Sequence, residues 1–193
     1  MSDIMISEIL HRSAEVKNKM ISVCAGPAEQ AAQMIATSMR KGGKLMLCGN
    51  GGSAGDSQHL AAEFVATLDH TKPRSGLPAL SLTTDTSFLT AYANDFGFEG
   101  VFARQVEALG RPGDVLLGIS TSGNSKNVLA AAKAAKDNQI SVIAFTGETG
   151  GQMADFADLL VAIPSRIIMH IQECHIALGH AITARVETLL SEK

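Results

Sequence analysis

Residues 48–63 read CGNGGSAGDSQHLAAE, and the pattern of the chain changes on either side of them. An apolar run at 44–48 comes before, and Leu60, Phe64 and Leu68 follow at helical spacing. A buried strand that ends in glycines and opens directly into a helix leaves free backbone N–H groups at the helix start, and the helix dipole adds to them. The stretch therefore predicts an anion-binding loop at residues 50–53.

His59 and Glu63 lie just inside the helix that this loop opens. Their spacing of four residues places both side chains on one helical face. A lone histidine here would fit an ordinary half-buried helix. Together with the loop, an imidazole and a carboxylate indicate chemistry on a phosphorylated compound.

The composition describes a chain with a substantial core and little net charge. It has 193 residues, of which 46% are hydrophobic, and a formal charge of −3. No general basic field attracts nucleic acid, and no apolar run approaches the roughly 18 residues that span a bilayer. The N-terminus lacks the pattern of a secretory signal, and three cysteines without CxxC spacing are typical of reduced thiols. We therefore expect a cytoplasmic protein.

Short apolar runs alternate with helical patterns along the chain. Strands are predicted at 44–48, 77–82, 115–119, 140–145 and 159–163. One helix is predicted from the loop at 50–53 to residue 68. Further helices are predicted at 85–92, at 99–109, after residue 125 and ending at about 136, near Met153, and at 167–190. Such alternation is typical of a parallel sheet covered on both faces. We predict one α/β domain over residues 1–193, with three layers and a five-stranded parallel sheet.

Two amphipathic helices are predicted before the first strand, at about 4–23 and 28–41, and Gly42-Gly43 ends the second. They would form an N-terminal helical pair over residues 1–43, ahead of an α/β core at 44–193. Their apolar stripes need a partner. In a single-domain α/β protein that partner is often another subunit.

A second polar loop, STSGNS at 120–125, follows the strand predicted at 115–119. It carries four hydroxyl groups in six residues, whereas an N-cap needs only one. Ligands of open parallel sheets bind at the carboxyl ends of the strands, where this loop and residues 50–53 both lie. Hydroxyls and helix-start N–H groups can hold a phosphate without Lys or Arg, so this loop too is predicted to bind phosphate.

The last predicted helix places polar groups among many apolar ones. Gln172 and His180 project within about a quarter turn of each other, and His170 and His175 are also present. Buried without partners these groups would be costly, so they are either solvated or part of a site. A His/Glu/His set with an amide can bind Zn²⁺, but one i,i+4 pair does not establish such a site.

Two nucleotide-binding motifs are not supported. Gly49, Gly51 and Ala54 loosely match the dinucleotide fingerprint, which requires an acidic residue at the tip of the second strand. Asp69 precedes that strand and Asp85 lies too far on. The chain also has no GxxxxGK[ST] run.

Four segments together resemble one enzyme family. They are CGNGGSAGDSQHLAAE, AYANDFGF, GDVLLGISTSGNSKNV and IQECHIALGH, in this order across nearly the whole chain. They resemble the phosphoheptose isomerases, sugar-isomerase (SIS) domain proteins that interconvert sedoheptulose 7-phosphate and D-glycero-D-manno-heptose 7-phosphate. The resemblance implies a five-stranded parallel sheet, a homotetramer with sites at subunit interfaces, and a role in making heptose for lipopolysaccharide.

The resemblance also implies roles for individual residues. Glu63 would be the catalytic base and His180 the acid. The sugar phosphate would contact Asn50, Gly51, Gly52, Ser53, Glu63, Asn94, Asp95, Ser120, Thr121, Ser122, Ser125 and Gln172. One zinc ion per subunit would be bound by His59, Glu63, Gln172 and His180.

The chain departs from the family pattern at two positions. Thr67 stands where an Arg is usual, and Met169-His170 stands where Ala-Arg is usual, which leaves Arg74 and His170 as candidate cations. The competing hypothesis is a non-catalytic SIS paralogue that binds a sugar phosphate or a replication initiator protein. Such paralogues lack the carboxylate at the position of Glu63 and carry Arg in place of Ser122, so both residues favour the enzyme.

Overall fold

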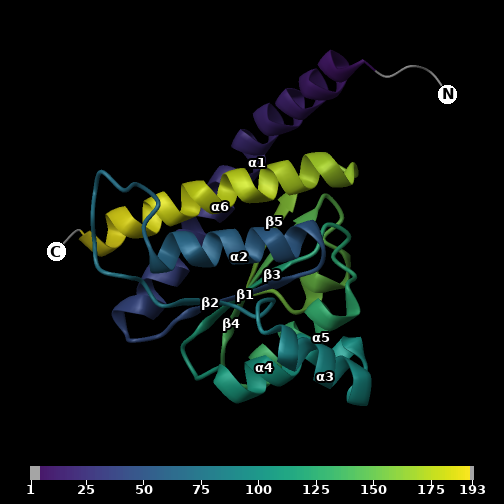
Figure 1. The fold of residues 1–193 in the computed structure, drawn as a ribbon. Helices are drawn as coiled ribbons and strands as arrows, with labels where there is room; N and C mark the ends of the chain where they lie inside the picture. Colours follow the sequence, from purple (N-terminus) through teal and green to yellow (C-terminus); the bar gives the residue numbers. More distant parts are fainter. Residues whose placement is uncertain (1–4, 192–193) are drawn as a thin grey trace.

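The computed structural model describes residues 5–191, and its strands form a single five-stranded sheet (Figure 1). Every neighbouring pair is parallel, in the order β2-β1-β3-β4-β5. The strands are β1 (Leu45–Gly49), β2 (Ala79–Ser81), β3 (Val115–Ile119), β4 (Ser141–Gly147) and β5 (Leu159–Ile163). The predicted sheet is confirmed; β3 and β5 have the predicted bounds, and β2 is shorter.

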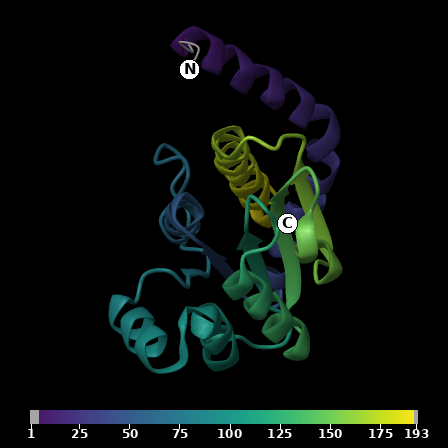
Figure 2. The same ribbon diagram turned by 90° about the vertical axis from the view of Figure 1, so that its right-hand side faces the viewer.

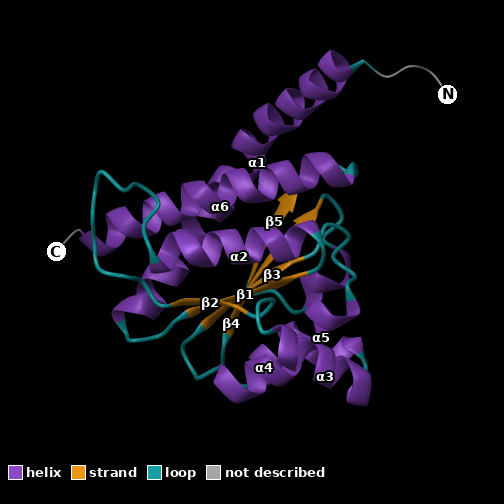
Figure 3. Cartoon of the chain, viewed as in Figure 1, coloured by secondary structure: helices purple, strands orange, loops and turns teal. Residues whose placement is uncertain are grey.

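Helices cover both faces of the sheet and complete three layers (Figure 3). One face carries α1 (Ile6–Arg40), α2 (Gly52–Val65) and α6 (Ile168–Ser191), and the other carries α3 (Thr86–Phe96), α4 (Val101–Leu109) and α5 (Lys126–Asp137). Short 3₁₀ turns lie at Phe98–Gly100 and Gly151–Asp155. Because strand side chains alternate, Leu45 and Leu47 face the first core while Met46 and Cys48 face the second.

The N-terminal region is one continuous helix, so the predicted helical pair is wrong. α1 runs through Pro27, although an internal proline costs a helix about 3 kcal/mol. Buried Met20, Cys24 and Ala28 keep a four-residue spacing across Gly26-Pro27, and this stripe packs against α6 and β5. Burial of the stripe holds the helix together where local propensity predicts a break.

The N-terminal part of α1 extends beyond the rest of the molecule, which both views show (Figures 1 and 2). Ile6 and Leu10 are 78% and 62% exposed there. Within residues 5–191, no helix is long and apolar enough to cross a membrane. At the other end of α1, Gly42 has φ +82° and closes the helix as predicted.

The sheet reverses its strand order between β1 and β3. These strands are neighbours, although β2 separates them in the sequence, and Gly49 pairs with Ile119 at their carboxyl ends. The Gly-rich loop after β1 and the Ser-rich loop after β3 therefore leave the sheet side by side. Crevices at such reversals are the usual ligand sites of open α/β sheets.

Candidate active site

The Gly-rich loop leads into α2 through residues that keep the helix start open. Gly51 has φ +55°, a conformation that favours glycine, and no side chain caps α2 there. Asn50 and Asn127 exchange two amide hydrogen bonds of 2.8 Å each, which connect this loop to the start of α5. The loop thus presents a helix N-terminus to the crevice, as an anion requires.

The Ser-rich loop gathers its hydroxyl groups at the start of α5. Ser120 Oγ lies 2.9 Å from Ser125 Oγ and 3.5 Å from Ser122 Oγ. Ser125 is the N-cap residue of α5, but its side chain forms no capping hydrogen bond to the helix. Three hydroxyls and an uncapped helix start converge here, which suits the oxygens of a phosphate.

A groove of about 370 Å³ opens beside this loop. Thr121 and Ser122 of the Ser-rich loop line this groove, as do Ser165 and Arg166 of the segment that leads into α6. Arg166 is the only cation among the lining residues and forms an ion pair with Glu148, which also lines the groove. No pattern in the sequence singled out Arg166.

The two cations proposed from the sequence lie elsewhere. The Arg74 guanidinium contacts the Glu187 carboxylate and donates to the backbone carbonyls of Glu63 and Phe64, where it caps the end of α2. That helix stops at Val65, so the predicted last turn to Leu68 does not form. His170 is 1% exposed and points into the protein.

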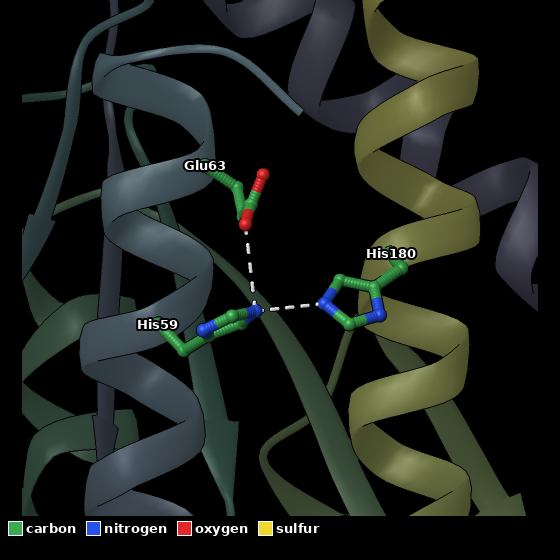
Figure 4. A group of neighbouring side chains, drawn as sticks. All are labelled: His59, Glu63 and His180. Atoms are coloured by element: carbon green, nitrogen blue, oxygen red, sulfur yellow. Dashed lines mark hydrogen bonds and ion pairs between the residues drawn. The ribbon is translucent and has the colours of Figure 1, made fainter. Parts of the chain in front are cut away.

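His59 and Glu63 of α2 meet His180 of α6 in one cluster (Figure 4). His59 Nε2 lies 2.8 Å from His180 Nε2 and 3.5 Å from Glu63 Oε1. One ligand atom from each residue lies within 4.8 Å of the others, so the three can hold a metal ion. At this distance one of the two facing imidazole nitrogens donates a hydrogen bond to the other, and a metal ion would take the place of that bond.

Two carboxylates on the same face of α2 have a buried oxygen without a hydrogen-bond partner, namely Glu63 Oε2 and Asp56 Oδ2. The free lone pairs of Glu63 Oε2 can take a proton from a substrate. Burial raises the pKa of Asp56, while the imidazoles of His59 and His180 act in the opposite direction. Sequence reasoning missed Asp56, although it stands one turn before His59 and two turns before Glu63.

Gln172 lies at the Gly-rich loop. A Cβ atom on Gly52 would stand only 2.6 Å from Gln172 Nε2, so the missing side chain at residue 52 makes room for this amide. Asn94 and Asp95, at the end of α3, are exposed and bond to each other through Asn94 Nδ2 and Asp95 Oδ1 at 2.8 Å. Their helix packs on the other face of the sheet, so within residues 5–191 no contact joins them to the cluster.

Comparison with known proteins agrees with this geometry. The SIS domain family model matches residues 10–147. A phosphoheptose isomerase of Roseiflexus sp. is 50% identical over 98% of this chain and 94% of its own length, and one of Aquifex aeolicus is 49% identical over 97% of both.

Two solved structures share the fold over nearly their whole length. A phosphoheptose isomerase from Neisseria gonorrhoeae is 44% identical, with a TM-score of 0.89 over 95% of this chain and 97% of that one. The enzyme from Francisella tularensis is 34% identical, with a TM-score of 0.91 over 95% and 96%. In sequence, topology and length this chain belongs to the phosphoheptose isomerase family of SIS-domain proteins.

Proposed function

We propose that this protein is a ketose–aldose isomerase that converts D-sedoheptulose 7-phosphate to D-glycero-D-manno-heptose 7-phosphate, for heptose and lipopolysaccharide precursor synthesis. The observation that carries the proposal is the meeting of Glu63, His59 and His180 beside two open helix starts. Relatives at about half identity are named phosphoheptose isomerases.

The two loops would bind the phosphorylated substrate. The phosphate would accept hydrogen bonds from the loop N–H groups and from the hydroxyls of the Ser-rich loop. The proposed contacts are Asn50, Gly51, Gly52, Ser53, Ser120, Thr121, Ser122, Ser125 and, beside Gly52, Gln172. Binding the phosphate remote from the reacting carbons holds those carbons in place.

Glu63 and His180 would transfer the protons. The carbonyl at carbon 2 of the ketose acidifies the proton on carbon 1. Glu63 Oε2 would remove that proton, giving a cis-enediol, and return it to carbon 2. His180 would move the proton between the two oxygens. Positioned groups of this kind each contribute about 10²- to 10⁴-fold to the rate.

The cluster also fits a zinc ion, one per subunit. His59, Glu63 and His180 already offer two nitrogens and one oxygen within 4.8 Å, and Gln172 would complete the set by turning from Gly52. Bound zinc would polarise the substrate carbonyl. The same Glu63 cannot be a strong base and a tight ligand at once, so we assign it first as base.

The enzyme would act as a homotetramer in the cytoplasm. Exposed Ile6 and Leu10 on the projecting part of α1 supply an apolar surface for other subunits. Asn94 and Asp95, remote from the cluster of their own chain, would contact substrate at a subunit interface. The three cysteines are buried and form no disulfide, as is usual in a reducing compartment. Burial raises the pKa of Cys48 to about 12 and that of Cys24 to about 11, which keeps both thiols unreactive.

One assay tests the proposal directly. Purified protein is incubated with sedoheptulose 7-phosphate, with and without a chelator, and the aldose is measured. Glu63→Gln and His180→Gln should each lose about 10²- to 10⁴-fold in kcat. Glu107→Gln and His70→Gln, at exposed positions, serve as matched controls and should retain activity.

Activity near wild type in either site variant would remove that residue from its role. If wild-type protein binds the sugar phosphate without turnover, the alternative of a non-catalytic SIS binding protein replaces the enzyme.

A further inference from the structure

Asp56 lies on the face of α2 that turns toward α6. Positions 52, 56, 59 and 63 lie on one face of α2 at spacings of three and four residues. Gly52 on this face meets Gln172 of α6, and His59 meets His180 of the same helix. Asp56 stands one turn from each of these contacts, so its carboxylate lies along the interface that contains the cluster.

Among residues 5–191, only two histidines act electrostatically on this carboxylate. Asp56 Oδ2 is fully buried and accepts no hydrogen bond, and neither lysine nor arginine pairs with Asp56 within residues 5–191. The charged groups that act on it are the imidazoles of His59 and His180. A buried acceptor without a hydrogen-bond partner destabilises a fold. Packing therefore does not explain a carboxylate at position 56, whereas the neighbouring cluster does.

The charge of a cation bound in the cluster would explain the carboxylate of Asp56. Two neutral imidazoles and one carboxylate bring a single negative charge to a divalent cation. One positive charge of the ion would then stay unbalanced in a site where Glu63 and His180 are half-buried and His59 is exposed, and the buried carboxylate oxygen of Asp56 would attract it. The carboxylate of Asp56 brings the sum for the ion, Glu63 and Asp56 to zero.

We propose that Asp56 is a positioning residue that balances the charge of a divalent cation held by His59, Glu63 and His180 and thereby raises its affinity. Asp56 would act on the ion through its charge and not as a ligand. This inference rests on the cation site of the proposed function. Removing such an outer partner typically costs 10- to 100-fold in metal affinity.

The test measures Zn²⁺ affinity by competition with a chromophoric chelator on full-length protein. Asp56→Asn, which keeps the shape and removes the charge, should weaken Zn²⁺ binding about 10- to 100-fold. Asp56→Ser, which fits within the same volume, should weaken it similarly and covers the case in which the amide does not fold. Asp137→Asn removes the same charge from an exposed site at the end of α5 and should leave the affinity within about twofold.

Thermal unfolding separates this role from a structural one. Without metal, Asp56→Asn should unfold at a higher temperature than wild type, because an unpaired buried charge is removed. Its rise in melting temperature on adding Zn²⁺ should be smaller than that of wild type. A carboxylate that merely supports the fold would lower the melting temperature of the metal-free protein.

Three results would overturn the inference: wild-type protein that binds no Zn²⁺, Asp56 variants that bind it within twofold of wild type, or an equal loss in Asp137→Asn. Isomerisation by the wild type is measured on the same preparation. If the wild type does not turn over substrate but its Zn²⁺ binding depends on Asp56, the proposed enzyme is refuted and this inference stands. If the wild type turns over substrate but the Asp56 variants bind Zn²⁺ as tightly as it does, this inference is refuted and the proposed enzyme stands.

Discussion

His175 is a fully buried side chain on the core face of α6. Its Nε2 lies 3.1 Å from the Thr146 carbonyl oxygen, to which it donates, and its Nδ1 has no partner. Burial lowers the pKa of His175 from 6.5 to about 4, outweighing the bond to Thr146. The imidazole is therefore neutral and structural, so neither of the two alternatives drawn from the sequence, solvation or membership of a site, applies to His175.

This burial predicts a pH dependence of stability. The unfolded chain takes up a proton near pH 6.5 and the folded chain only near pH 4, so the contribution is complete above 6.5 and is lost as the pH falls toward 4. The full loss, reached near pH 4, amounts to about 3 kcal/mol of unfolding free energy. Denaturant unfolding at about pH 7.5 and pH 5 should show about 2 kcal/mol of it. His175→Phe should flatten the dependence, whereas exposed His70→Gln should not; equal slopes in all three proteins would contradict this account.

Single residues show where sequence reasoning ends. His59, Glu63 and the hydroxyls of the Ser-rich loop were predicted because their spacing and position are local properties. Asp56 was missed because the burial of an unpaired oxygen is visible only in the folded chain. Arg74 was considered a substrate-binding cation, but the pairing with Glu187, far away in sequence, makes it a helix cap.

Helix α1 gives a prediction about an element. Gly26 lies inside this helix, and apart from its two chain neighbours a Cβ atom there would meet nothing within 4 Å. Gly26→Ala should therefore raise the unfolding free energy by at most about 0.5–1 kcal/mol, the usual helix preference for alanine, because the ring of Pro27 crowds a Cβ on the residue before it. Chemical denaturation measures the change.

A glycine in α6 is the matched control. A Cβ atom on Gly179 would lie 2.6 Å from both Leu60 methyl groups in the α2–α6 interface. Gly179→Ala has the same propensity gain but should destabilise the protein by about 1–3 kcal/mol through overpacking. If the unfolding free energy rises in both variants, the α2–α6 interface can accommodate the extra methyl group, which would contradict the expected overpacking.

Elements were predictable where the local pattern and the packing agree. The runs at 115–119 and 159–163 are apolar throughout and became β3 and β5 with those bounds. The break predicted near Gly26-Pro27 did not occur, because the stripe that α6 and β5 bury continues across it. Helix propensity depends on residues that are close in sequence, whereas α1 is stabilised by packing against α6 and β5, which are distant in sequence.

The assembly of the whole molecule can be tested through the projecting part of α1. Light scattering of the wild type should give four times the 20.2 kDa monomer mass. Leu10→Glu, a charge at an exposed apolar position, should shift the protein to smaller species. Lys19→Glu, a charge change at a polar position of the same helix, should leave the mass unchanged. A monomeric wild type would refute the homotetramer.

At this scale the sequence supports the topology but not the assembly. Alternating strands and helices imply a parallel sheet, and the two polar loops then fall at its carboxyl edge. The sequence pattern does not show where Asn94 and Asp95 lie relative to the cluster. In the fold, their helix α3 packs on the opposite face of the sheet from α2 and α6.

Arg74 joins the far end of α2 to α6: its guanidinium holds the Glu63 and Phe64 carbonyls on one helix and the Glu187 carboxylate on the other. The loop that carries Arg74 therefore connects the two helices from which His59 and His180 face each other. A chain that lost this arginine would keep its sheet and both polar loops but would lose a link between α2 and α6. We expect this loop to tolerate substitution less than an ordinary surface loop.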